Sequence, residues 1–157
     1  MMNNERRYLI KAIELARANL REGGRPFGAL VVCNDEVIAT GVNEILATHD
    51  PTAHAELLAI RAASHQLASS DLSECVVYAS GHPCPMCMAA MTMSGIKKVV
   101  YAYSNEDGAP FGLSTAAVYD ELAKPFSEQA MLIKHVPVDA ESVPSLYSEW
   151  ASAQDKS

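Results

Sequence analysis

Two stretches of the chain decide how it folds and what it can bind: THDPTAHAELLAI at residues 48–60 and CVVYASGHPCPMC at residues 75–87. The first holds His54 and Glu56, and the second ends in Cys84 and Cys87, spaced as Cys-x-x-Cys. One His and two Cys make three zinc ligands, whereas a structural zinc site usually has four. A catalytic zinc keeps three protein ligands and leaves one position to water. The pattern therefore predicts a catalytic zinc site, with Glu56 as a carboxylate that does not bind the metal.

The residues around the first pair predict a helix start. Asp50 is suited to cap a helix N-terminus and Pro51 to occupy its first position, so we expect a helix from here through Ile60. His54 and Glu56 then lie in the first turn of that helix.

The second stretch predicts a strand followed by a helix. The apolar run at residues 75–79 indicates a buried strand, and two prolines then turn the chain into a helix over residues 86–93. Cys84 and Cys87 bracket the start of that helix, where backbone N–H groups and the helix dipole favour a thiolate. Two helix N-termini are therefore expected to meet at one metal.

The rest of the chain alternates helical and strand patterns, which favours an α/β layer architecture. Further helices are expected at residues 4–20, 118–122 and 143–151, and further strands at residues 29–33, 37–40, 99–103 and 131–133. Asn34-Asp35 would join the first two of these strands as a hairpin. The length fits one domain over residues 1–157.

Composition limits the class of the protein and its partners. With 49% apolar and 20% charged residues, the chain is typical of soluble globular proteins, and it has no apolar run that predicts a membrane span. The formal charge is −7, and Arg6-Arg7 and Lys97-Lys98 are isolated basic pairs. Surfaces that bind nucleic acid normally cluster such residues. We therefore expect a small, uncharged or weakly charged substrate and neither a nucleic acid nor a membrane as partner.

The N-terminal residues and the cysteines bear on the cell compartment. Residues 1–7 lead into an amphipathic segment instead of the continuous apolar stretch of a signal peptide, so we expect a cytoplasmic protein. Reduced thiols fit that compartment. Cys33 and Cys75 lie in apolar strand-like runs and are expected to be buried core residues without a chemical role.

These motifs resemble those of the cytidine deaminase-like superfamily of zinc-dependent nucleobase and nucleoside deaminases. Its signature, His-x-Glu followed by Pro-Cys-x-x-Cys, matches residues 54–56 and 83–87. Residues 26–29, 41–43 and 49–56 resemble the branch that contains bacterial guanine deaminases and tRNA adenosine deaminases. Within that branch, residues 119–125 and the length of the C-terminal part are more similar to the guanine deaminases.

The resemblance implies a fold and an assembly. The fold is α/β, a three-layer α/β/α sandwich with a central mixed five-stranded sheet. Members of the family form dimers or larger oligomers, so we expect a homodimer. A helix rich in methionine would suit the interface: Met86, Met88, Met91 and Met93. Exchange of the C-terminal helix between subunits stays open.

The resemblance also implies roles for the site residues. Zinc held by His54, Cys84 and Cys87 would lower the pKa of a bound water toward neutrality. Glu56 would take the proton of that water, deliver it to the ring nitrogen beside the attacked carbon, and later protonate the leaving amine.

Three further residues are expected to hold the substrate. Asn43 would form a hydrogen bond with the base, Phe27 would pack in its pocket, and the backbone N–H of Ala55 would hold a polar edge. Each of the first two side chains has an alternative: Asn43 also suits a turn, and Phe27 also suits the core.

Departures from the guanine deaminase pattern leave the substrate open. His82 stands where that family has Glu, and it could serve as a fourth zinc ligand or lie at the pocket rim. Met93 stands where the family has Trp, and Ser114-Thr115 where it has paired Asp. We expect hydrolytic deamination of a free nucleobase or related amino-heterocycle, first of all guanine to xanthine plus ammonia. The alternatives are a tRNA-specific adenosine deaminase and a deaminase of cytosine, another aminopyrimidine, a pterin or a triazine.

Overall fold

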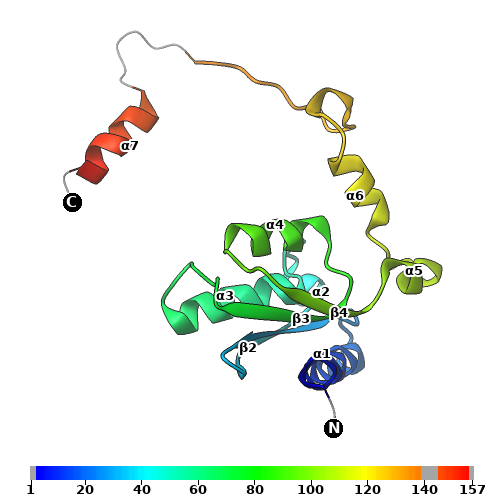
Figure 1. Ribbon diagram of the computed structural model, residues 1–157. Helices are drawn as coiled ribbons and strands as arrows, with labels where there is room; N and C mark the ends of the chain where they lie inside the picture. Colours follow the sequence, from blue (N-terminus) through cyan, green and yellow to red (C-terminus); the bar gives the residue numbers. More distant parts are fainter. Residues whose placement is uncertain (1–2, 139–144, 156–157) are drawn as a thin grey trace. The chain divides into compact units, whose positions relative to one another are not determined.

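The computed structural model describes residues 3–138 and 145–155, and the chain divides into two compact units, residues 1–123 and 124–157. The first unit contains the strands β1 (Gly28–Cys33), β2 (Glu36–Val42), β3 (Cys75–Gly81) and β4 (Val99–Tyr103). It also contains the helices α1 (Asn4–Arg21), α2 (Ile45–Thr48), α3 (Ala55–Leu67), α4 (Pro85–Met93), α5 (Asn105–Gly108), η1 (Ala109–Phe111) and α6 (Ala116–Leu122) (Figure 1). The second unit contains η2 (Phe126–Glu128) and α7 (Leu146–Asp155). None of the described helices is long and apolar enough to cross a membrane.

The sheet of the first unit is mixed, with the strand order β2-β1-β3-β4. β1 pairs antiparallel with β2 and with β3, and β3 pairs parallel with β4. The hairpin between β1 and β2 turns at Asn34 and Asp35, whose φ angles are 51° and 63°. Two consecutive residues with positive φ make a type I′ turn, which suits the twist of the strands. The predicted hairpin is therefore confirmed.

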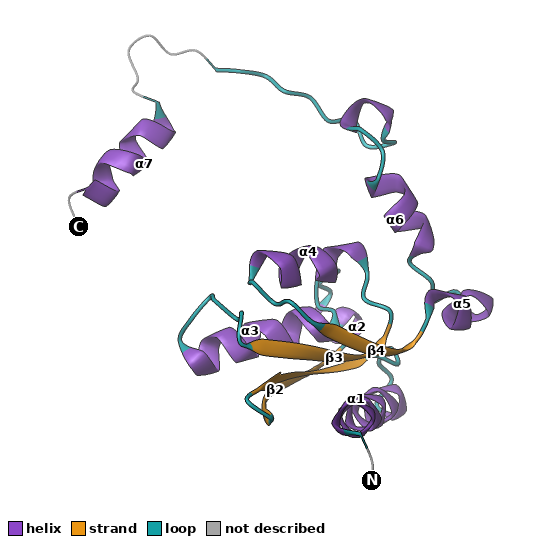
Figure 2. Cartoon of the chain, viewed as in Figure 1, coloured by secondary structure: helices purple, strands orange, loops and turns teal. Residues whose placement is uncertain are grey.

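Helices cover both faces of this sheet, which gives the expected three layers (Figure 2). Side chains alternate along β1, so Leu30 and Val32 face one side and pack with Tyr8 and Ala12 of α1. The intervening side chains, including that of Val31, face the other side, where α3 and α4 contribute to a second cluster. The site described below is built on that second face.

The number of strands differs from the sequence prediction. The described residues form a four-stranded sheet, not a five-stranded one, and residues 131–133 are not a strand. Leu132 is 91% exposed. A strand is stabilised by pairing with a neighbouring strand, and a run of three apolar residues does not specify such a neighbour. An apolar run this short is therefore weak evidence for a strand. The last helix begins at Leu146, while residues 143 and 144 of the predicted helix lie outside the described range. The single domain over residues 1–157 stays a prediction.

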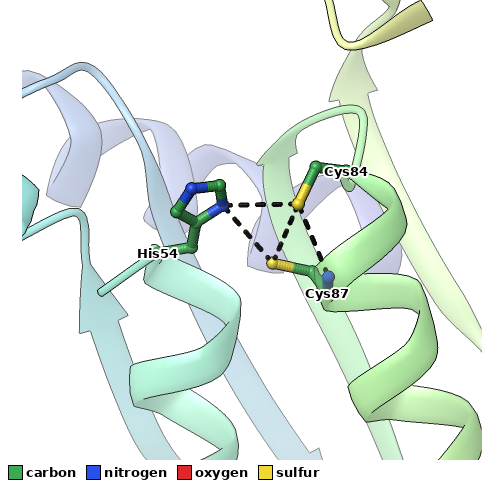
Figure 3. Close-up of side chains that lie close together, drawn as sticks. All are labelled: His54, Cys84 and Cys87. Carbon is green, nitrogen blue, oxygen red and sulfur yellow. Dashed lines mark hydrogen bonds between the residues drawn. The ribbon is translucent and has the colours of Figure 1, made fainter. Parts of the chain in front are cut away.

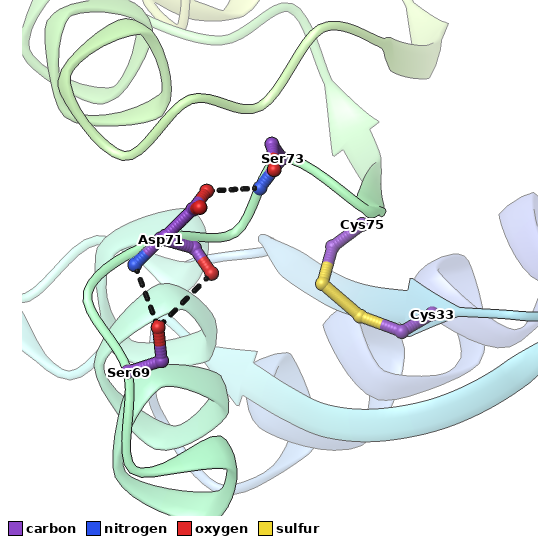
Figure 4. Close-up of a disulfide and its surroundings, with 5 residues drawn as sticks. All are labelled: Cys33, Ser69, Asp71, Ser73 and Cys75. Atoms are coloured by element: carbon purple, nitrogen blue, oxygen red, sulfur yellow. Dashed lines mark hydrogen bonds between the residues drawn. A yellow bond between two sulfur atoms is a disulfide. The ribbon is translucent and has the colours of Figure 1, made fainter.

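Cys33 and Cys75 are buried, as expected, but they form a disulfide instead of two free thiols (Figure 4). The two residues lie directly opposite each other in the register of β1 and β3, with their Cα atoms 4.4 Å apart. The prediction of unpaired thiols was wrong because the pairing depends on which strands become neighbours. Sequence spacing does not contain that information.

Candidate active site

The start of α3 places His54 at the site. The Asp50 side chain accepts hydrogen bonds from the backbone N–H and hydroxyl of Thr52, at 2.8 and 2.7 Å. These bonds close a turn over residues 50–52, so Pro51 lies in the turn and not in the helix. The prediction of Asp50 as N-cap was therefore wrong: α3 begins at Ala55, and His54 is its N-cap residue with an extended backbone.

The start of α4 places the two cysteines as the sequence predicts. Cys84 is the N-cap residue, Pro85 is the first helical residue, and Cys87 lies one turn into the helix. The backbone N–H of Cys87 donates to Cys84 Sγ over 3.5 Å. A sulfur in this position is stabilised as a thiolate by the positive end of the helix dipole.

The side chains of His54, Cys84 and Cys87 point toward one another from these two helix starts (Figure 3). His54 Nδ1 lies 3.4 Å from Cys84 Sγ and 3.6 Å from Cys87 Sγ, and the two sulfurs are 3.6 Å apart. Usual zinc bond lengths in a tetrahedral site require about 3.5 Å between N and S and about 3.8 Å between the sulfurs. The three ligand atoms therefore have the spacing of three corners of a zinc tetrahedron.

Without a metal, the ligands share protons. A hydrogen bond with Cys87 and a second with His54 lower the pKa of Cys84 to about 4. The hydrogen bond with Cys84 and burial raise the pKa of Cys87, and the hydrogen bond with Cys84 also raises the pKa of His54. The Cys84 thiolate is thus stabilised by protons on Cys87 and His54, and a metal ion would displace these protons.

A cavity of about 200 Å³ opens beside these ligands. Glu56 lines it and is only 7% exposed, and burial raises the pKa of its carboxyl group. Asn43, Phe27 and Ala55 line the same cavity, as the resemblance implied. Asn43 is buried, and its Oδ1 accepts a hydrogen bond from the Ile45 backbone N–H at 3.1 Å. This orientation leaves the amide N–H groups of Asn43 as its donors to the cavity.

The residues that depart from the guanine deaminase pattern lie partly at the cavity and partly on the surface. His82 lines the cavity, and its ring stacks on Tyr101 with 4.8 Å between ring centroids and also contacts Tyr119. Among the described residues, the group of converging ligand atoms is His54, Cys84 and Cys87, and His82 is not part of it. Ser114 and Thr115 line the cavity, whereas Met93 is 88% exposed and does not.

Arg25 also lines the cavity, and the sequence reasoning missed it. The sequence offers one weak indication: Arg25 directly precedes Pro26 and Phe27, and Phe27 is expected in the pocket wall. A single Arg in a loop resembles any solvated surface charge in a sequence, so only the fold identifies it.

Comparison with known proteins gives the family. The family described as the cytidine and deoxycytidylate deaminase zinc-binding region matches residues 2–103. The guanine deaminase of Bacillus subtilis (strain 168) is 36% identical over 156 residues, which cover 99% of this chain and 98% of that protein. The tRNA-specific adenosine deaminase of Aquifex aeolicus (strain VF5) is 38% identical over 96 residues, or 60% of this chain and 64% of that protein.

Solved structures agree with these sequence matches. The X-ray structure of guanine deaminase from Bacillus subtilis matches with a TM-score of 0.85 and 35% identity, covering 98% of this chain and 95% of that chain. A guanine deaminase from Nitrosomonas europaea matches with a TM-score of 0.65 and 33% identity, covering 69% and 63% of the two chains. The chain therefore belongs to the cytidine and deoxycytidylate deaminase family and is a zinc-binding hydrolytic deaminase.

Proposed function

We propose that this chain hydrolyses guanine to xanthine and ammonia. One observation carries the proposal: of three converging zinc ligands, His54 and Cys84 line one cavity together with a buried carboxylate, in a chain that matches a guanine deaminase along nearly its whole length. The cavity volume of about 200 Å³ suits a single heterocycle, since pockets for drug-sized ligands usually span about 300–1,000 Å³.

Proton transfer is the task of Glu56. His54, Cys84 and Cys87 would hold zinc, which would act as a Lewis acid and lower the pKa of a bound water. Glu56 takes a proton from the attacking water and delivers it to the ring nitrogen beside C2 of guanine. A second transfer through Glu56 protonates the amino group, so that the C2–N bond breaks, ammonia leaves and a carbonyl forms at C2. Burial suits this role because it raises the pKa of the carboxyl group and strengthens it as a base.

The remaining cavity residues hold the base. Ala55 is the first residue of α3, so its backbone N–H has no acceptor within the helix and can donate to the substrate. The amide N–H groups of Asn43 donate to a carbonyl oxygen or ring nitrogen, and Phe27 packs against the ring. Guanine has hydrogen-bond acceptors on both of its rings. They match the N–H donors that Ala55 and Asn43 present to the cavity.

The proposal also includes the cell compartment and the oligomeric state of the protein. The chain acts as one deaminase domain over residues 1–157, in the cytoplasm and as a homodimer. The sequence match across the whole chain supports one domain. Apolar side chains on α7 support an interface, since Leu146, Tyr147 and Trp150 are 71%, 82% and 65% exposed.

A second candidate is deamination of adenosine in tRNA, which the match to tRNA-specific adenosine deaminases favours. Both activities use the same ligands and the same proton transfer. The formal charge of −7 disfavours this candidate, because binding to a polyanion depends on clustered positive charge. A tRNA substrate would also make the rate fall steeply as salt concentration rises, whereas turnover of a free base would change little.

The test is ammonia release by the zinc-loaded protein. The substrates are guanine, other aminopurines, cytosine, the corresponding nucleosides, pterins and aminotriazines, with a tRNA transcript measured at low and high salt. Turnover of guanine that Glu56→Ala abolishes would support the proposal. Activity confined to another base would replace the substrate and keep the mechanism, and activity on tRNA alone would establish the second candidate.

A further inference from the structure

Arg25 lies at the opening of the active-site cavity. Among the described residues that line this cavity, Arg25 alone carries a permanent positive charge. Arg25 is exposed, whereas Glu56 and Asn43 are buried. The exposed side chain of Arg25 therefore marks the solvent end of the cavity and the buried Glu56 its interior, and the positive charge of Arg25 also acts on the half-buried His54.

The backbone of Arg25 is held in place by the same side chain that holds Asn43. Asn19, near the end of α1, donates from Nδ2 to the Arg25 carbonyl at 2.8 Å and to the Asn43 carbonyl at 2.9 Å. The Arg25 carbonyl also accepts from the Phe27 N–H at 2.9 Å. The loop before β1 and the end of β2 are thus tied together, so the base of the Arg25 side chain keeps a defined position beside the cavity.

The Arg25 side chain has no protein partner within residues 3–138 and 145–155: no hydrogen bond or ion pair engages it. Glu56 is the one carboxylate among the described residues that line the cavity. Of two neutral hydroxyl groups nearby, that of Thr115 donates to Asn105 Oδ1, while Ser114 Oγ accepts from the Ala116 N–H and keeps its own hydrogen as a donor. The guanidinium is therefore the strongest group at the opening that is free to bind a ligand.

The reaction defines which part of a purine reaches this opening. The reacting amino group of guanine is attached to C2, in the six-membered ring, and must lie near Glu56 and the zinc ligands. The five-membered ring then lies at the far end of the base, toward the opening. In the neutral base one nitrogen of this ring is an acceptor and the other carries a hydrogen; when the ring loses that proton, both nitrogens are acceptors and share the negative charge. A guanidinium group binds such an edge through charge-assisted hydrogen bonds.

We infer that Arg25 is a substrate-binding residue that contacts the five-membered ring of the purine and makes the enzyme favour purines in which that ring is anionic. This inference rests on the proposed function, because it assumes that guanine binds with its reacting amino group toward Glu56 and its five-membered ring toward Arg25. It adds a preference based on charge to a pocket that otherwise recognises hydrogen-bond acceptors.

The experiment compares guanine with 8-azaguanine, whose additional ring nitrogen makes the five-membered ring more acidic. Steady-state kinetics are measured at a pH where 8-azaguanine is an anion and guanine is neutral. Arg25→Gln removes the charge and keeps a polar side chain, and Arg25→Lys keeps the charge without the planar fork. Arg21→Gln is the matched control, because Arg21 is exposed on α1 and does not line the cavity.

Arg25→Gln is expected to raise KM for 8-azaguanine about tenfold and KM for guanine less than about threefold, with kcat unchanged for both substrates. Arg25→Lys should recover part of the loss, and Arg21→Gln should change neither value. Equal effects on the two substrates, or no effect, would overturn the inference while guanine turnover keeps the proposed function.

A binding measurement separates the two proposals if the wild-type protein deaminates neither purine. That result would count against the proposed function. Binding of both bases is then measured by calorimetry in the zinc-loaded Glu56→Gln protein, with and without Arg25→Gln. Selective loss of 8-azaguanine binding would sustain the role of Arg25, and identical binding of both bases in the two proteins would refute it.

Discussion

At the scale of single residues, two of the three metal ligands hold protons that zinc must displace. Hydrogen bonds lower the pKa of Cys84 to about 4 and raise the pKa values of Cys87 and His54. Near neutral pH the metal-free site therefore holds a Cys84 thiolate beside a protonated Cys87, and the hydrogen bond with Cys84 favours the protonated form of His54. Zinc binds the deprotonated forms, so binding must release these protons.

We therefore expect zinc binding to release between one and two protons, roughly, at neutral pH and to weaken as pH falls. Calorimetric titrations in buffers of different ionisation enthalpy measure the number released. Cys87→Ser removes one of the donors and should release fewer protons with lower affinity. A binding enthalpy that is the same in all buffers would contradict this expectation.

Glu56 is expected to serve catalysis at a cost to stability. Burial raises its pKa above the ordinary value of 4.5, so ionising Glu56 opposes folding. By linkage, the contribution of Glu56 to the stability of the metal-free protein is fully present below pH 4.5 and is lost as pH rises through the higher pKa of the folded state. At neutral pH, Glu56→Gln removes the penalty and should raise the free energy of unfolding.

The same substitution should keep zinc and lower kcat by about 10²–10⁴-fold, because Gln cannot accept the proton. Urea unfolding of the metal-free protein, metal analysis and ammonia release measure the three effects. Glu14→Gln is the control, since Glu14 is exposed on α1. A Glu56→Gln protein that is no more stable than wild type at neutral pH would contradict the stability argument.

At the scale of elements, the position of α3 on the sheet depends on a glycine in β2. A Cβ atom added at Gly41 would collide with the carbonyl oxygen of Ala55 and lie 2.7 Å from the backbone nitrogen of Ala59. Both are backbone atoms of α3, so a side-chain rotation cannot relieve the collision. The N-terminus of α3, with His54 and Glu56, lies at this contact.

Gly41→Ala should therefore push α3 away from β2 and lower the free energy of unfolding by about 1–3 kcal/mol. Because His54 moves with the helix, zinc affinity should fall as well. Thr40→Ala, an exposed position on the same strand, is the control and should change neither quantity by much. Wild-type zinc affinity in a folded Gly41→Ala protein would show that the contact does not position the ligand.

At the scale of the whole molecule, exposed apolar side chains predict self-association. Tyr147 and Trp150 of α7 are 82% and 65% exposed, and large aromatic residues are enriched in protein interfaces. We expect light scattering after size exclusion to give twice the chain mass of 16.9 kDa. Trp150→Glu should shift the protein toward monomer, and Ser152→Glu on the same helix is the control for added charge. A monomeric wild-type protein would exclude the homodimer.

Part of the fold could be predicted from local sequence because its signals are local. Apolar residues at helical spacing predicted α1, and the Asn34-Asp35 turn predicted the first hairpin. The Cys-x-x-Cys spacing and the prolines beside it predicted that Cys84 and Cys87 open α4. Asp50 misled the prediction, because its side chain can cap a turn as readily as a helix and the local sequence is compatible with both.

The sequence by itself determined the ligand types, their places at two helix starts and the α/β character of the chain, because residue chemistry and periodicity are properties of short segments. Only the tertiary structure decided that Cys33 lies opposite Cys75, that the described sheet has four strands, and that Arg25 lies at the cavity. These features join residues far apart in the chain. Strand pairing and packing bring them together, and no short segment encodes which strands become neighbours.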